Sequence, residues 1–113
     1  MPSQQPYPEF IKALPQAELR LPGVAAYLIT SPQSQVAFFE IAAGAEYPPH
    51  SHDAQWGIIV EGQVELTIGG VVHRLGPGDS YSIGRGVEHS IKVLTYCRAI
   101  DVFEDPRRYQ PRS

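Results

Sequence analysis

Residues 64–68 (VELTI) alternate strictly between hydrophobic and polar side chains. Such alternation places the two kinds of residue on opposite faces of an extended strand. Gly69-Gly70 follows at once, and a second apolar run begins at Val71. Two glycines between two such runs are typical of a tight two-residue turn, because glycine adopts the positive φ angles that this turn requires. The pattern therefore predicts a β-hairpin.

Short apolar runs divided by Gly, Pro and Ser continue along the chain from Val24, and none has a helical period over the length of a helix. The predicted strands are residues 24–30, 35–42, 56–60, 63–68, 71–75, 80–83, 89–93 and 96–103. Eight short strands fit a barrel or a sandwich, so the sequence predicts an all-β fold. One short stretch, 9–14, could form a turn or two of helix before Pro15 ends it.

The chain divides into three parts by composition. Residues 1–22 hold five of the eleven prolines and are predicted to form an N-terminal arm, and residues 23–104 form the β-rich body. Residues 105–113 are a C-terminal tail that contains three arginines and two prolines. A basic, proline-containing chain end is usually solvated, which is the interpretation favoured for this tail.

Composition narrows the choice of partners and compartment. The 113 residues and 12.5 kDa suit one domain, and 42% hydrophobic with 19% charged residues is typical of a globular protein. A net charge of −3 argues against nucleic acid as a partner. The apolar stretches are too short for a membrane helix, and no secretory signal precedes the body, so we expect a cytoplasmic protein. Cys97 is the single cysteine, which excludes an intrachain disulfide.

Three of the four histidines are candidate metal ligands. His50 and His52 are two positions apart, so in an extended segment both imidazoles lie on one face. Sites of this kind usually take further ligands from a neighbouring strand, and the candidates are His89, at the start of a predicted strand, and Gln55. Strict alternation would turn Gln55 away, so a bend at residues 53–54 is needed to bring it back. His73 is interpreted as a solvated hairpin residue.

The same residues fall into a longer pattern of two motifs, G(X)5HXH(X)3,4E(X)6G and G(X)5PXG(X)2H(X)3N. The first begins at Gly44, continues through the two histidines and ends at Gly62, with Gln55 in place of the acid and one residue fewer before it. The second begins at Gly78 and reaches His89, with Gly84 in place of the proline and Val93 in place of the asparagine. In both motifs the chain resembles the cupin superfamily over residues 24–103.

This resemblance implies a double-stranded β-helix, or jelly-roll, cupin barrel behind a proline-rich arm. It also implies a divalent transition metal, namely zinc, iron, nickel, manganese or copper, on His50, His52, Gln55 and His89. An amide in place of the usual carboxylate would leave the full charge on the ion, making it a stronger Lewis acid that is held less tightly. In an alternative arrangement only the three histidines bind the ion, and Gln55 donates a hydrogen bond behind them.

Other polar and aromatic side chains are candidates for the substrate pocket. Trp56 is a candidate for the wall or mouth of the cavity because it follows Gln55, and Phe38 for one inward position of its strand. The remaining candidates are Tyr47, Tyr81, Glu40, Tyr96 and Arg98.

Two functions follow from the resemblance. The first is a metal-dependent enzyme of the dioxygenase, isomerase or cyclase type that acts on a small organic molecule inside the barrel. The second is a non-enzymatic barrel that binds or senses a small molecule. A homodimer is expected in both, because small cupins commonly pair and the arm offers apolar side chains, such as Tyr7 and Phe10, to a neighbour.

Overall fold

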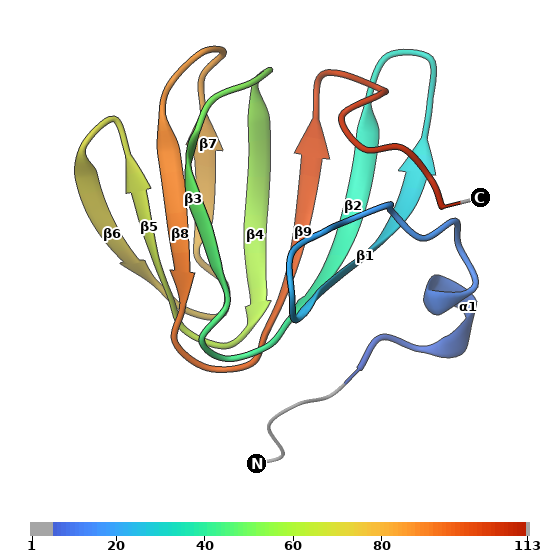
Figure 1. Ribbon diagram of the computed structural model, residues 1–113, viewed down its shortest axis with the longest axis horizontal. Coiled ribbons are helices and arrows are strands. Elements are labelled where there is room, and N and C mark those ends of the chain that lie inside the picture. Colours follow the sequence, from blue (N-terminus) through green and yellow to red (C-terminus); the bar gives the residue numbers. More distant parts are fainter. Residues whose placement is uncertain (1–5, 113) are drawn as a thin grey trace.

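The computed structural model describes residues 6–112 and consists of two antiparallel sheets that face each other (Figure 1). A single short helix, α1 (Glu9–Lys12), precedes them. The strands are β1 (Val24–Thr30), β2 (Gln35–Ile41), β3 (Glu46–His50), β4 (Gln55–Glu61), β5 (Val64–Ile68), β6 (Val71–Leu75), β7 (Ser80–Ile83), β8 (His89–Val93) and β9 (Cys97–Phe103). The all-β jelly-roll fold expected from the sequence is therefore confirmed.

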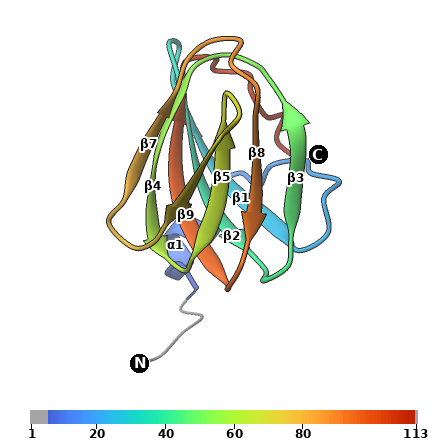
Figure 2. The same cartoon turned by 90° about the vertical axis from the view of Figure 1, so that its left-hand side faces the viewer.

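The strand order explains how residues far apart in sequence come together. The larger sheet has the order β1-β2-β9-β4-β7, and the smaller has β3-β8-β5-β6 (Figure 2). Each sheet thus pairs a strand of the first motif with a strand of the second, β4 with β7 and β3 with β8. The predicted hairpin joins β5 to β6, with Ile68 opposite Val71 and positive φ angles at Gly69 and Gly70.

The core lies between the sheets. Along β2 and β9 every second residue is buried, so one face of each strand points inward. The buried hydrophobic cluster consists of Ala17, Ala26, Leu28, Ala37, Phe39, Ile41, Ile59, Val64, Val93, Cys97, Ala99 and Phe103. Burial of these side chains is the main stabilising contribution to a sandwich of this kind.

The structure contains a strand that the sequence pattern did not predict. β3 carries Pro48-Pro49, which interrupts the expected pattern because proline lacks the amide proton that a strand donates to its neighbour. β3 lies at the edge of the smaller sheet, where a missing donor is tolerated, and its pairing with β8 shifts register between Tyr47 and His50. This irregular strand end places His50 directly opposite His89.

The two chain ends pack on the barrel and on each other. The Glu18 amide donates to the Gln110 carbonyl over 2.7 Å, and the Arg112 amide donates to the Gln16 carbonyl over 2.8 Å. In the arm, Tyr7 is 5% exposed and donates its hydroxyl proton to the Ala99 carbonyl. Tyr7 therefore packs on its own barrel, whereas Phe10 is 77% exposed.

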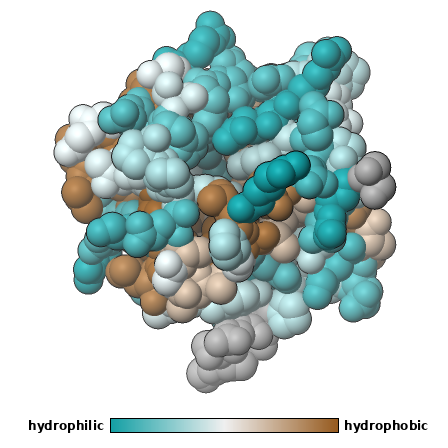
Figure 3. All heavy atoms as spheres, viewed as in Figure 1, coloured by the Kyte–Doolittle hydropathy of each residue, from teal (hydrophilic) through white to brown (hydrophobic). Residues whose placement is uncertain are grey.

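The surface is mostly polar in the view of Figure 3, with hydrophobic residues at its left margin, where β6 lies, and in the middle of the face. Val71 and Val72 of this edge strand are 58% and 62% exposed. Within residues 6–112, no helix combines the length and the apolarity that crossing a membrane would require.

Candidate metal centre

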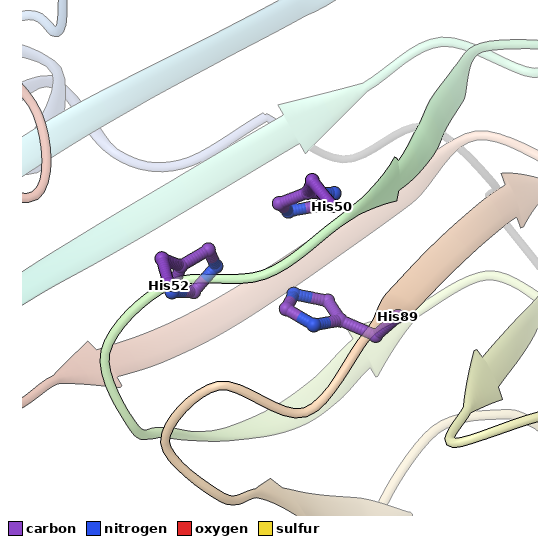
Figure 4. A group of neighbouring side chains, drawn as sticks. All are labelled: His50, His52 and His89. Carbon is purple, nitrogen blue, oxygen red and sulfur yellow. The ribbon is translucent and has the colours of Figure 1, made fainter.

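Three histidines converge at one end of the barrel. His50 ends β3, His52 lies in the loop that follows, and His89 begins β8 (Figure 4). One possible ligand atom from each lies within 4.8 Å of those of the other two, and the His50 and His89 ring centroids are 4.3 Å apart. The Gly86 amide donates to the His52 carbonyl over 2.9 Å, which ties the two motif loops together.

Each of the three imidazoles has its Nδ1 atom next to a backbone carbonyl. The distances are 2.8 Å from His50 to Pro48, 2.9 Å from His52 to Asp53 and 3.0 Å from His89 to Val87. A carbonyl oxygen only accepts, so each Nδ1 carries the proton in the neutral ring. The lone pair is then on Nε2 in all three, which is the tautomer that a metal ligand needs.

The surroundings favour the neutral form of His52 and His89. Burial lowers the pKa of His52, and the positive charge of Arg108 lowers it further. Burial also lowers the pKa of His89, where the neighbouring histidines and Arg108 act in the same direction. Neutral imidazoles are the form that binds a metal, so these two rings are prepared for ligation at neutral pH.

Gln55 enters the site from the opposite sheet. The chain crosses from β3 to β4 in residues 51–54, so Gln55 is free of the alternation that governs the histidines. Its amide Nε2 donates to the Asp101 carboxylate over 2.7 Å, and its buried Oε1 has no hydrogen-bond partner. Because Asp101 orients the amide, the free oxygen of Gln55 is available as a fourth ligand.

Asp101 is a buried carboxylate that the sequence analysis missed. It is 4% exposed and accepts a second hydrogen bond, of 2.8 Å, from the Tyr81 hydroxyl. Burial raises its pKa to about 7, against the opposing effect of the bonds from Tyr81 and Gln55. Gly57 lies between Asp101 and Tyr81 across the sheet, and its missing side chain leaves the space that the Tyr81 ring occupies.

The C-terminal segment supplies one side of the cavity. Arg108 and Tyr109 both line it, with the guanidinium carbon of Arg108 4.5 Å from the centre of the Tyr109 ring. Buried Gln35 fixes this segment, since its side chain bonds both the amide and the carbonyl of Tyr109. The interpretation of the tail as a solvated end is therefore wrong for Arg108.

The structure separates the predicted pocket residues into two groups. The cavity is lined by the three histidines, Gln55, Phe39, Ile41, Tyr47, Leu66, Tyr81, Ile83, Ile91, Cys97, Ala99, Asp101, Phe103, Arg108 and Tyr109. Tyr47 and Tyr81 are the further predicted pocket residues in this set. His73, as expected, is exposed on the hairpin.

Five side chains expected at the pocket lie outside its lining, because their neighbours in the strand occupy the inward positions. Phe38 and Glu40 alternate with inward Phe39 and Ile41, and both contact Tyr7 on the outer face. On β4, Gln55 faces inward and Trp56 is 46% exposed.

The other two of the five are Tyr96, which directly precedes β9, and Arg98, its second residue. Arg98 bonds Glu61 over 2.9 Å and stacks on Tyr7. Tyr96 lines a separate surface depression with Glu40. The expectation that these five side chains face the interior is therefore corrected.

A divalent metal fits the donor set of this site. Three imidazoles present Nε2, and the unpartnered Gln55 oxygen supplies a neutral amide donor close to the Asp101 carboxylate. Histidine nitrogen and amide oxygen suit several first-row transition metals and give no preference among them.

Comparison with known proteins identifies the protein family. The cupin domain model matches residues 37–103, which is more than half of the chain, so the chain belongs to the cupin family. A search of curated proteins gives no match.

Solved structures agree with this assignment. KdgF from Halomonas sp. is 28% identical, with a TM-score of 0.74 over 82% of this chain and 86% of that one. An RmlC-like cupin from Shewanella frigidimarina is 24% identical, with a TM-score of 0.77 over 86% and 87%. Oxalate decarboxylase from Bacillus subtilis is 23% identical, with a TM-score of 0.74, and the match covers 86% of this chain but 29% of that one.

Proposed function

We propose that this cupin is a metal-dependent enzyme, of the dioxygenase, isomerase or cyclase type, that acts on a small organic molecule inside the barrel. The observation that carries the proposal is the set of three Nδ1-to-carbonyl bonds, which leaves three Nε2 atoms for one ion. His50, His52, His89 and the Oε1 atom of Gln55 would hold a divalent transition metal.

A metal bound there would supply Lewis acidity to a substrate oxygen or open positions for oxygen chemistry. The chain's own contribution to proton movement is Asp101, the sole carboxylate among the cavity-lining residues that the structure describes. Its two oxygens accept from Tyr81 and Gln55, which hold the carboxyl group in one orientation beside the proposed metal ligands. This arrangement favours an enzyme over a passive binding barrel.

Elemental analysis tests the metal proposal. Untagged wild-type protein is expected to contain about one equivalent of a transition metal, and a His50→Ala, His52→Ala double variant should lose most of it. His73→Ala removes an exposed histidine outside the cluster and serves as the matched control. Absence of metal from the wild type, even after reconstitution, would contradict the proposal.

Variants of Asp101 separate an enzyme from a binding module. Small organic compounds are screened with the metal-loaded protein, and an enzyme is expected to convert one of the compounds that it binds. Asp101→Asn should then bind this compound but turn it over about 100-fold more slowly or worse, which is the usual effect of losing a proton-transfer group. A compound that binds tightly and is never converted would indicate the sensing barrel instead.

We also propose a cytoplasmic homodimer that pairs through the outer face of the larger sheet. Ile29, Val36, Val102 and Trp56 form a continuous apolar row across four strands, and Trp56 is 46% exposed. Light scattering should give twice 12.5 kDa, and Trp56→Glu should give the monomer. Val72→Glu, on the other sheet, is the control, and a wild-type mass of one chain would contradict the dimer.

The proposed cytoplasmic location is tested separately by cell fractionation, in which the protein should be found in the cytoplasmic fraction.

A further inference from the structure

The cavity contains one cationic side chain whose charge has no partner in the structure. Arg108 is the only lysine or arginine among the described residues that line the cavity. Its Nε atom is buried without a hydrogen-bond partner, and no ion pair between residues 6–112 involves it. Arg108 is half-buried, and a buried donor without a partner is costly, so this position suits an anion.

The guanidinium group is held in place before any ligand arrives. Its carbon lies 4.5 Å from the centre of the Tyr109 ring and 5.7 Å from that of Phe103, and these two rings are nearly perpendicular. The backbone on either side is fixed by the bonds of Arg108 to Asp105 and of Tyr109 to Gln35. A planar cation fixed in this way is a preorganised receptor for a planar anion.

A second polar group lies in the same cavity. The Tyr47 hydroxyl is buried next to the Tyr109 hydroxyl, and the two do not form a hydrogen bond of good geometry. A phenol keeps its proton at neutral pH and can donate it to an anion. Tyr47, Arg108, His52 and His89 all line this one cavity, so the phenol, the cation and the histidines face the same space.

The charge of the cavity points the same way. Arg108 contributes one positive charge and Asp101 at most one negative charge, so a divalent ion on the histidines would leave the site net positive. The remaining walls are largely apolar, with Phe39, Leu66 and Ile91 among them. A single guanidinium matches the two oxygens of a carboxylate, whereas a phosphate group usually draws on several cations or a backbone loop.

We propose that Arg108 and Tyr47 form a subsite for the carboxylate group of a small organic acid, whose carbon skeleton packs against the apolar walls. The substrate of the proposed enzyme is then an organic carboxylate. Only this last step rests on the proposed function, because the anion subsite is built from residues that are not metal ligands.

Paired acids and amides test the subsite by calorimetry. Propionate and benzoate are compared with propionamide and benzamide, in protein stripped of metal by a chelator and in metal-loaded protein, with inorganic phosphate as a further probe. In the metal-free wild type at least one acid is expected to bind on the order of tenfold more tightly than its amide. Arg108→Gln should abolish this difference, and Arg107→Gln, which removes an exposed neighbouring charge, should retain it.

Three results would overturn the subsite: equal binding of acid and amide, a preference for the acid that persists in Arg108→Gln, or tighter binding of phosphate than of either acid. If Arg108→Gln does not fold, Arg108→Lys keeps the charge but lacks the planar fork, and it should bind the acid several-fold more weakly. Unchanged affinity in that variant would count against the proposal.

Metal content is measured on the same samples. A wild type with metal and no preference for the acid contradicts the subsite alone. A wild type without metal that still prefers the acid contradicts the proposed function alone.

Discussion

The two walls of the cavity are built from different chemistry. The smaller sheet and the loop after β3 contribute His50, His52 and His89, whose Nδ1 atoms lie against backbone carbonyls and leave Nε2 for an ion. The larger sheet and the C-terminal segment contribute the unpartnered amide oxygen of Gln55, the carboxylate of Asp101 and the cation of Arg108. We call these sets the histidine wall and the charged wall.

The difference shows how the work of the site is divided. The histidine wall is made by two short motifs and local carbonyl contacts, and it can hold an ion. The charged wall comes from three separate segments that meet only in the folded barrel, and its groups suit proton transfer and anion binding. The metal alone therefore does not determine the reaction, and changes on the charged wall should alter chemistry and stability in ways that depend on charge.

The largest expected effect concerns the pH dependence of stability. The pKa of Asp101 is about 7 in the fold against an ordinary 3.8, so between pH 4 and 7 the folded protein binds more protons than the unfolded chain. The free energy of unfolding therefore falls as pH rises through this window, by roughly 4 kcal/mol at most. Asp101→Asn should lack this component.

Urea denaturation of metal-free protein at a series of pH values measures that slope. His52 and His89 contribute the opposite trend, because their lowered pKa values make stability rise as pH increases towards 6.5. This contribution is common to the wild type and the variant and cancels in their difference. A difference that is constant between pH 4 and 7 would show that Asp101 is not a buried, titrating member of the charged wall.

The next effect concerns the packing of the charged wall. A β-carbon added at Gly57 would lie 2.5 Å from three atoms of the Tyr81 phenol, so Gly57→Ala should displace that ring from Asp101. We expect a loss of about 1–3 kcal/mol in the free energy of unfolding, the usual cost of overpacking. Gly84→Ala, where the added carbon meets Val87 at 3.5 Å, is the control and should change stability little. Equal effects in both variants would contradict the role of Gly57.

A smaller effect is expected when a negative charge is added to the proposed set of metal ligands. Gln55→Glu places a carboxylate among the histidines, and metal retention against a chelator should increase by about tenfold. Gln63→Glu adds the same charge at an exposed position and should leave the rate of metal loss unchanged. Equal rates in the wild type and Gln55→Glu would place Gln55 outside the metal shell.

The sequence predicted the histidine wall far better than the charged wall. Residue types at fixed spacing identify His50, His52 and His89, and four strands (β1, β6, β7 and β8) have the predicted bounds. Asp101 was missed because both faces of β9 carry apolar residues, so its alternation with Ile100 and Val102 does not reveal which face is inside. The signal that could have found it is an acid on the same face as Ala99 and Phe103.

Arg108 lay beyond any local pattern. It follows the last strand, and long-range bonds, among them those of Tyr109 to Gln35, 74 residues away in sequence, bring the segment to the cavity. β3 was missed for the opposite reason, since Pro48-Pro49 gives a clear local signal against a strand that an edge position overrides. The position of Arg108 and the pairing of β3 both depend on long-range contacts, which the alternation of polar and apolar residues along a strand does not reveal.

Anomalous diffraction from crystals of the metal-loaded protein tests the central claim most directly. The account predicts one anomalous peak within bonding distance of Nε2 of His50, His52 and His89, on the side that faces Gln55. Coordination through Nδ1, or a peak at another place in a fully loaded protein, would contradict the account.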